Sequence, residues 1–156
     1  MTTQAHQRYV LVETLISIAI NLVISATFAW IVFHGRTRIP LWGAEGYAID
    51  FAPQTFMIAL MSVVVPTLIT RRRTRLGKVQ PRAVAKRGLP ARLWLRAPLL
   101  AVAATLVLGG VVVGLISVAL PDTLGFPPLL ALKLAYAAVI AGVMTPIGLR
   151  AALADP

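Results

Sequence analysis

Four apolar runs of roughly 20 residues each are the feature that most constrains how this chain can fold, because a helix needs about that many apolar residues to cross a bilayer. We therefore expect transmembrane helices over residues 9–33, 51–70, 97–120 and 129–149. The composition agrees, since 58% of the residues are hydrophobic and only 13% are charged. The sequence predicts an all-α membrane protein, a bundle of four transmembrane helices that forms a single integral membrane domain over residues 1–156.

The stretch 71–96, between the second and third runs, carries ten Lys and Arg residues and no acid. Basic loops stay on the cytoplasmic side, so we expect a cytoplasmic loop here, both termini in the cytoplasm and loops 35–50 and 121–128 outside. A bacterial inner or plasma membrane is the expected location.

Juxtamembrane Lys and Arg are attracted to anionic lipids, so we expect the basic stretch to contact such lipids or an acidic protein partner, and not nucleic acid. Arg92 and Arg96 flank Trp94, where their charged ends are expected to reach water. The predicted contact residues are Arg71, Arg72, Arg73, Arg75, Arg92 and Arg96.

One face of the first run is polar. Glu13, Ser17, Asn21 and Ser25 recur every four residues, and each such step advances only about 40° round a helix. Because lipid cannot satisfy polar groups, this face is expected to look into the bundle or into a watered cavity. For Asn21 we expect a hydrogen bond to another helix.

Glu13 has two interpretations. The favoured one makes it an interfacial residue, because a span that begins at Thr14 is already long enough to cross. The alternative makes it an intramembrane proton or cation site. Its candidate partners would then be Thr67, Thr145, Arg71, Arg96 and Arg150.

Two further predictions concern the outer end of the bundle. Lys133 lies about a turn inside the fourth run, and we expect its long stem to extend to the headgroups, with an ion pair to Asp50 or Glu45 as the alternative. The apolar loop 35–50 is expected to lie on the membrane surface, the alternative being a plug in the outer mouth of the bundle.

Small residues predict how two of the helices pack. Gly110 and Gly114 in the third run, and Ala138 and Gly142 in the fourth, are spaced four apart, which lets helices approach closely. We therefore expect the third and fourth helices to pair.

Pro66 and Pro146 are expected to kink the second and fourth helices, since each removes a backbone donor. Each is followed within five residues by an arginine, which suggests the hypothesis that the chain consists of two similar two-helix hairpins. The spacing back to Phe51 and Phe126 differs between the halves, which argues against duplication.

No catalytic or nucleotide-binding fingerprint occurs, so we do not expect an enzyme. The absence of cysteine and the two separated histidines predict no metal site, and no cofactor is implied. The favoured function is a non-catalytic accessory or assembly subunit that binds other membrane subunits or further copies of itself. The alternative is a small solute or ion transporter or channel subunit that uses the polar face of the first span.

Overall fold

The computed structural model describes residues 3–80, 90 and 92–154. In this part of the chain, four helical segments are long and apolar enough to cross a membrane. They are α1 (Thr3–Phe33), α2 (Tyr47–Arg75), the continuous run of α3 (Leu93–Ala104), η1 (Thr105–Gly109) and α4 (Gly110–Ala119), and α5 (Phe126–Ala154). The predicted all-α bundle of four transmembrane helices is confirmed, and the chain is an integral membrane protein.

The helices are longer than the apolar runs that predicted them. Helix α2 begins at Tyr47 and continues through Arg75, so the first basic residues of the stretch 71–96 lie on a helix and not in a loop. Basic side chains interact favourably with the dipole at a helix C-terminus, which allows α2 to extend past its apolar segment. Helix α3 likewise begins at Leu93, within the expected loop. Residues 81–89 and 91 lie outside the described part.

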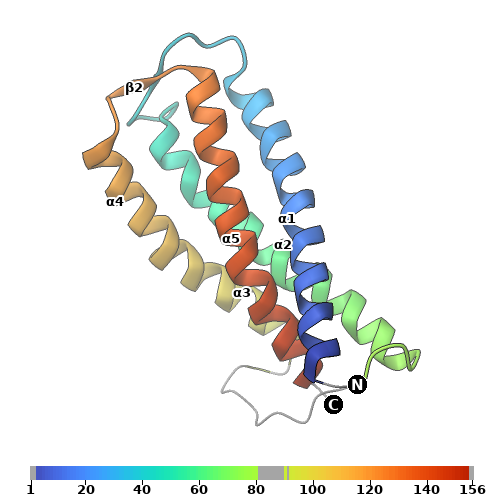
Figure 1. The fold of residues 1–156 in the computed structure, drawn as a ribbon. Coiled ribbons are helices and arrows are strands. Elements are labelled where there is room, and N and C mark those ends of the chain that lie inside the picture. Colours follow the sequence, from blue (N-terminus) through green and yellow to red (C-terminus); the bar gives the residue numbers. More distant parts are fainter. Residues whose placement is uncertain (1–2, 81–89, 91, 155–156) are drawn as a thin grey trace.

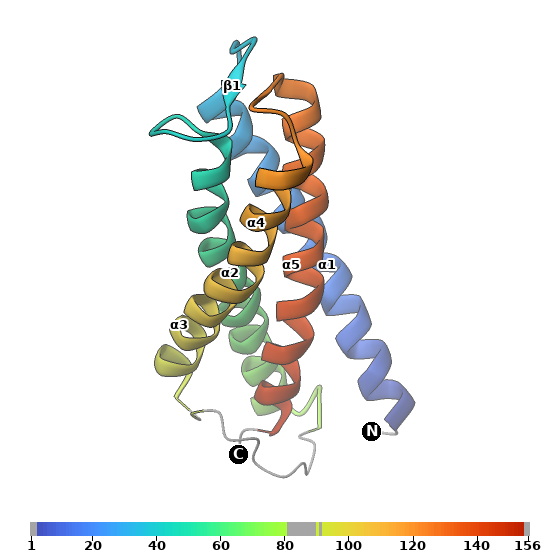
Figure 2. The same cartoon turned by 90° about the vertical axis from the view of Figure 1, so that its left-hand side faces the viewer.

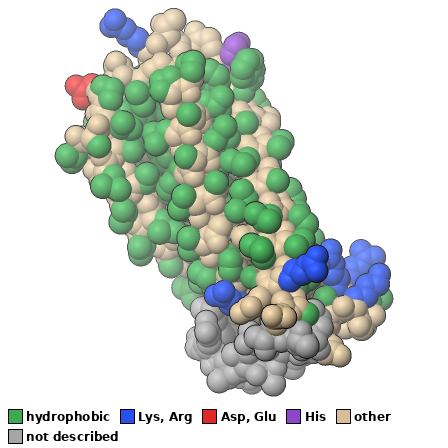
Figure 3. All heavy atoms as spheres, in the orientation of Figure 1, with side chains coloured by type: hydrophobic (Ala, Val, Ile, Leu, Met, Phe, Trp, Pro, Cys, Tyr) green, Lys and Arg blue, Asp and Glu red, His purple; other side chains and the backbone are tan. Residues whose placement is uncertain are grey.

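The described starts of α1 and α3 and the ends of α2 and α5 share one end of the bundle (Figure 1). We call this end, which carries Arg71, Arg72, Arg73 and Arg75, the basic end. Figure 3 shows Lys and Arg side chains gathered mainly there, while hydrophobic side chains cover the middle of the visible face. This distribution is expected for helices that are surrounded by lipid.

Helices α2 and α5 lie side by side at the centre of the bundle (Figures 1 and 2). Helix α1 packs mainly on α5, and the run from α3 to α4 packs on α2. The predicted pairing of the third helix with the fourth is therefore wrong. The two halves are arranged alike: the first helix of each half packs on the second helix of the other half, and the two second helices pack on each other. Two similar hairpins related by an axis along the membrane normal would give this arrangement. The duplication itself stays a prediction.

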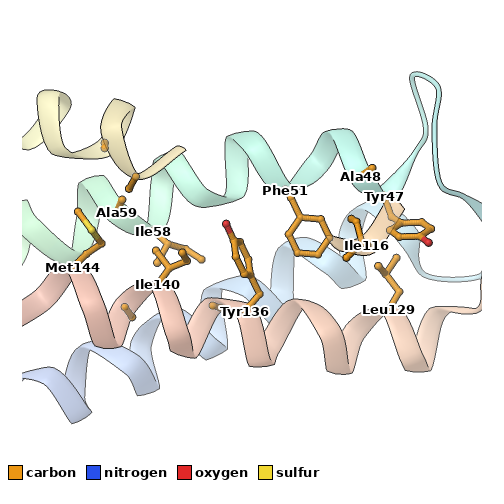
Figure 4. Packing of buried hydrophobic residues seen from close by; sticks show 14 of the residues in the cluster. Tyr47, Ala48, Phe51, Ile58, Ala59, Ile116, Leu129, Tyr136, Ile140 and Met144 are labelled. Carbon is orange, nitrogen blue, oxygen red and sulfur yellow. The ribbon is translucent and has the colours of Figure 1, made fainter. Parts of the chain in front are cut away.

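Side chains of α2 and α5 form the centre of the core (Figure 4). The rings of Phe51 and Tyr136 meet edge to face, with centroids 5.0 Å apart. The Tyr136 hydroxyl also lies 2.6 Å from the Thr55 hydroxyl, so this buried phenol has a polar partner. Ile58, Ile140 and Met144 continue the contact toward the basic end.

The third helix meets α2 through a small-residue face different from the one predicted. Its buried small residues are Ala97, Ala101, Ala104 and Gly109. A π-helical turn at η1 takes up one extra residue, and it brings Gly109 to within reach of Thr55, whose Oγ1 lies 3.4 Å from the position of an added Cβ. Spacing alone could not identify this face.

Gly110 and Gly114, the predicted packing residues, face away from the bundle and are exposed. Apart from the adjacent residues and backbone of its own helix, no atom of the described residues lies within 4 Å of a Cβ added at either glycine. On α5, Gly142 faces Ile18 of α1, and Ala138 is partly buried. Neither glycine of the third helix mediates the predicted contact among the described residues.

The close approach between α2 and α5 occurs at Gly148. A Cβ added there would lie 3.1 Å from the backbone Cα of Val63, so only glycine fits without a shift of the helices. Both predicted kink residues, Pro66 and Pro146, lie inside continuous helices. The bend expected at each proline stays a prediction.

The two loops at the end opposite the basic end pair with each other. Strand β1 (Ile39–Pro40) runs antiparallel to β2 (Thr123–Leu124), and the Tyr47 hydroxyl donates to the carbonyl of Pro121 at 2.9 Å. Ile39 and Tyr47 are fully buried. The loop 35–50 therefore packs against the loop that precedes α5, and its position relative to the membrane surface stays a prediction. We call this end the capped end.

Candidate functional site

Helix α1 presents its polar face to the interior of the bundle. Glu13, Ser17, Asn21 and Ser25 are between 4% and 7% exposed. The intervening apolar residues of α1, such as Leu15 and Val23, are more than half exposed. The four-residue spacing thus sets the orientation of the whole helix, because its polar groups avoid lipid.

Each of these four side chains contacts a polar side chain of another helix. Glu13 forms an ion pair with Arg73, and Ser17 accepts a hydrogen bond from the Thr145 hydroxyl at 2.8 Å. The Asn21 amide donates to the Ser62 hydroxyl at 3.3 Å, and the Gln54 amide donates to Ser25 at 2.9 Å. We call this set of four residues and their partners Arg73, Thr145, Ser62 and Gln54 the polar seam.

The basic end of the polar seam is a small network around Glu13. Arg73 Nη1 donates to the Glu13 carboxylate and, at 3.5 Å, to the Tyr9 hydroxyl. The Tyr9 hydroxyl in turn lies 2.9 Å from that of Thr70. Arg73 was not among the predicted partners of Glu13, because the second span was expected to end at Thr70. The Glu13 side chain is 7% exposed, so the protein covers its carboxylate, while its depth in the membrane stays a prediction.

At its other end, the polar seam meets a buried lysine that lies next to Gln54. Lys133 is 2% exposed and forms an ion pair with Asp50, and its ammonium donates to Gln54 Oε1 at 2.7 Å. It also lies 5.5 Å and 5.0 Å from the ring centroids of Phe33 and Phe51. The expectation that Lys133 extends to the headgroups is wrong, and the alternative pair with Asp50 is what the structure contains.

Helix length explains this outcome. Helix α5 begins at Phe126 and α2 at Tyr47, so Lys133 lies two turns inside α5 and Asp50 lies in the first turn of α2. A negative charge is favourable at a helix N-terminus. The contacts with Asp50, Gln54, Phe33 and Phe51 hold the lysine side chain inside the bundle.

A cavity opens at each end of the polar seam. At the capped end, a cavity of about 370 Å³ reaches Asp50 and is bordered by the exposed ion pair of Arg36 and Glu45. Toward the basic end, a groove of about 110 Å³ between α1 and α2 reaches Glu13, Ser17 and Asn21. The hydrogen bond between Ser25 and Gln54 lies in the segment between the two cavities.

The predicted basic contact residues lie in different surroundings. Arg72, Arg75 and Arg92 are exposed, and Arg71 is partly buried. Arg96 is only 1% exposed, so the expectation that its charge reaches water is wrong. Within the described part of the chain, no group of three or more His, Asp and Glu residues could hold a metal ion.

Comparisons of the chain with protein-family models, with curated proteins and with solved structures gave no match.

Proposed function

We propose that the protein is a non-catalytic accessory or assembly subunit of a complex in a plasma membrane, with its basic end in the cytoplasm. The observation that carries this proposal is the outward orientation of Gly110 and Gly114. Glycine in a helix interior costs about 1 kcal/mol relative to alanine. Packing within the described part of the chain does not require glycine at either position.

A small-residue face on the outside of a transmembrane helix lets the backbone of a second helix come close. In a bilayer this contact matters, because lipid tails are as apolar as the side chains they cover and burial alone gives little driving force. The polar seam supports the same function, since its side chains are engaged within the chain. The proposed partner is a transmembrane helix of another subunit or of a second copy.

The double variant Gly110→Leu/Gly114→Leu tests this proposal. Both positions have open space for a side chain, so the fold should be retained while the close helix contact is blocked. Ala131 and Ala135 of α5, also exposed and four residues apart, provide the matched control Ala131→Leu/Ala135→Leu. Native mass spectrometry from mild detergent should show a stoichiometric complex for the wild type and the control, and a lone chain for the glycine variant. A complex that survives in the glycine variant would contradict the proposal.

The polar seam favours a second candidate, a small proton or cation transporter. Buried ionisable residues within a membrane are typical of ion pathways, and the seam joins the pair Glu13–Arg73 to the pair Lys133–Asp50. In vesicles that contain the purified protein, this function predicts a pH-driven proton or cation flux that Glu13→Gln abolishes. If the flux into these vesicles does not exceed that of protein-free vesicles, the transporter function is contradicted and the accessory function is the candidate that remains.

A further inference from the structure

The groove between α1 and α2 has apolar walls and opens to the outside of the bundle. Its walls are the side chains of Ile16, Ile20, Ile24, Met61, Val65 and Ile69. These six side chains are between 38% and 49% exposed, so each wall is half covered by the protein and half free. The groove exists because α1 packs mainly on α5 and meets α2 through the polar contacts of the seam.

Two arginines lie at the basic end of this groove. On α2, Arg72 and Arg73 follow Ile69 by three and four residues, so they share its face of the helix. Arg72 is exposed, and the Arg73 side chain is 40% exposed. Within the described part of the chain, the hydrogen bonds of Arg73 use only Nη1, and a guanidinium carries further donors on Nε and Nη2.

We propose that this groove binds one acyl chain of an anionic phospholipid, whose phosphate contacts Arg72 and Arg73. The apolar walls match a hydrocarbon chain, and the arginines lie where the groove reaches the basic end. Basic pockets between transmembrane helices are suited to anionic headgroups, and arginine binds phosphate with two parallel hydrogen bonds.

Glu13 sets the electrostatics of the site. Its carboxylate lies in the groove and would repel a phosphate, but its ion pair with Arg73 neutralises it. The variant Glu13→Gln keeps the size of the side chain and removes this competitor for Arg73. The site therefore predicts that Glu13→Gln binds the anionic lipid more tightly than the wild type does.

The test compares phosphatidylglycerol with phosphatidylcholine of identical chains, added to the purified protein and counted by native mass spectrometry. The wild type should retain one phosphatidylglycerol in preference to phosphatidylcholine. Two arginine contacts of roughly 1 kcal/mol each predict that Arg72→Gln/Arg73→Gln binds phosphatidylglycerol about 30-fold more weakly. The matched control Arg75→Gln/Arg150→Gln removes the same charge from exposed positions at the same end and should keep the preference.

A second variant tests the groove without changing any charge. Ile20→Phe/Val65→Phe fills the groove and should release the lipid, whereas Ile31→Phe, on an exposed part of α1 outside the groove, should not. Glycerol phosphate should fail to displace the lipid, because it lacks the acyl chain. Three outcomes would overturn the proposal: a lipid preference that survives both double variants, equal losses in the controls, or displacement by glycerol phosphate.

Discussion

Lys133 of α5 and Asp50 of α2, 83 residues apart in the sequence, form an ion pair inside the bundle. The lysine side chain is 3% exposed and the aspartate 34% exposed, so the pair runs from the interior to the cavity at the capped end. Gln54 joins it to Ser25, which makes α1, α2 and α5 members of one network.

Removing one partner of this pair should destabilise the protein strongly. Asp50→Asn leaves the Lys133 charge buried without its counter-ion, and such a loss typically costs about 3–5 kcal/mol. The double variant Asp50→Asn/Lys133→Met should recover part of that loss, because no unpaired charge remains. Unfolding in detergent, followed by circular dichroism, measures both. Equal stability of the wild type and Asp50→Asn would contradict the buried pair.

The hydrogen bond from Asn21 to Ser62 predicts a smaller effect. Asn21→Leu should lower the free energy of unfolding by about 1 kcal/mol, since interhelical hydrogen bonds in membranes contribute on that order. Thr27 of α1 bonds only to the carbonyl of Val23 in its own helix, among the described contacts, so Thr27→Val is the matched control and should change little. If Thr27→Val lowers the free energy of unfolding more than Asn21→Leu does, the loss comes from contacts within α1 and not from the bond to Ser62.

Gly148 and Gly110 should respond oppositely to alanine. At Gly148 a Cβ meets the Val63 backbone, so Gly148→Ala should destabilise by about 1–3 kcal/mol through overpacking. At Gly110 it meets open space, and Gly110→Ala should be neutral or stabilise the isolated chain by up to about 1 kcal/mol. The same unfolding measurement checks both, and a reversed order would show that α5 does not approach α2 at Gly148.

The orientation in the membrane can be checked with single cysteines, because the chain has none of its own. Thr37→Cys and Thr123→Cys lie in the two loops that pair at the capped end, so they should label alike. With the basic end in the cytoplasm, both should react with an impermeant thiol reagent in intact cells, and Lys78→Cys should not. If Lys78→Cys reacts and the two loop variants do not, the protein has the opposite orientation in the membrane.

The sequence predicted the four helices because span length and hydropathy are local properties. It also predicted the polar residues that α1 buries, since a four-residue spacing defines one helix face. It did not identify Arg73 as the partner of Glu13, because the apolar run ends at Thr70 and the helix does not. Where an apolar segment stops is a poor guide to where its helix stops.

The other incorrect predictions also depend on features that the local sequence does not show. The face that the third helix buries depends on the π-helical turn at Thr105–Gly109, which no glycine spacing reveals. The burial of Lys133 depends on Asp50 and Gln54 of α2, which lie 83 and 79 residues away in the sequence. Gln54 and Ser62 were missed as partners, and Thr145 was named for Glu13 and not for Ser17, because single polar residues in apolar helices identify no contact until the helix neighbours are known.

The packing of α1 on α5 has a consequence for synthesis. Helix α1 leaves the ribosome before α5, and Thr145, which bonds to Ser17, is translated 128 residues after it. During that interval Ser17 and its neighbours occupy the bilayer, or the insertion machinery, without their final contact on α5. Helix α1 can therefore insert early, but its hydrogen bond to α5 forms only after α5 has been made.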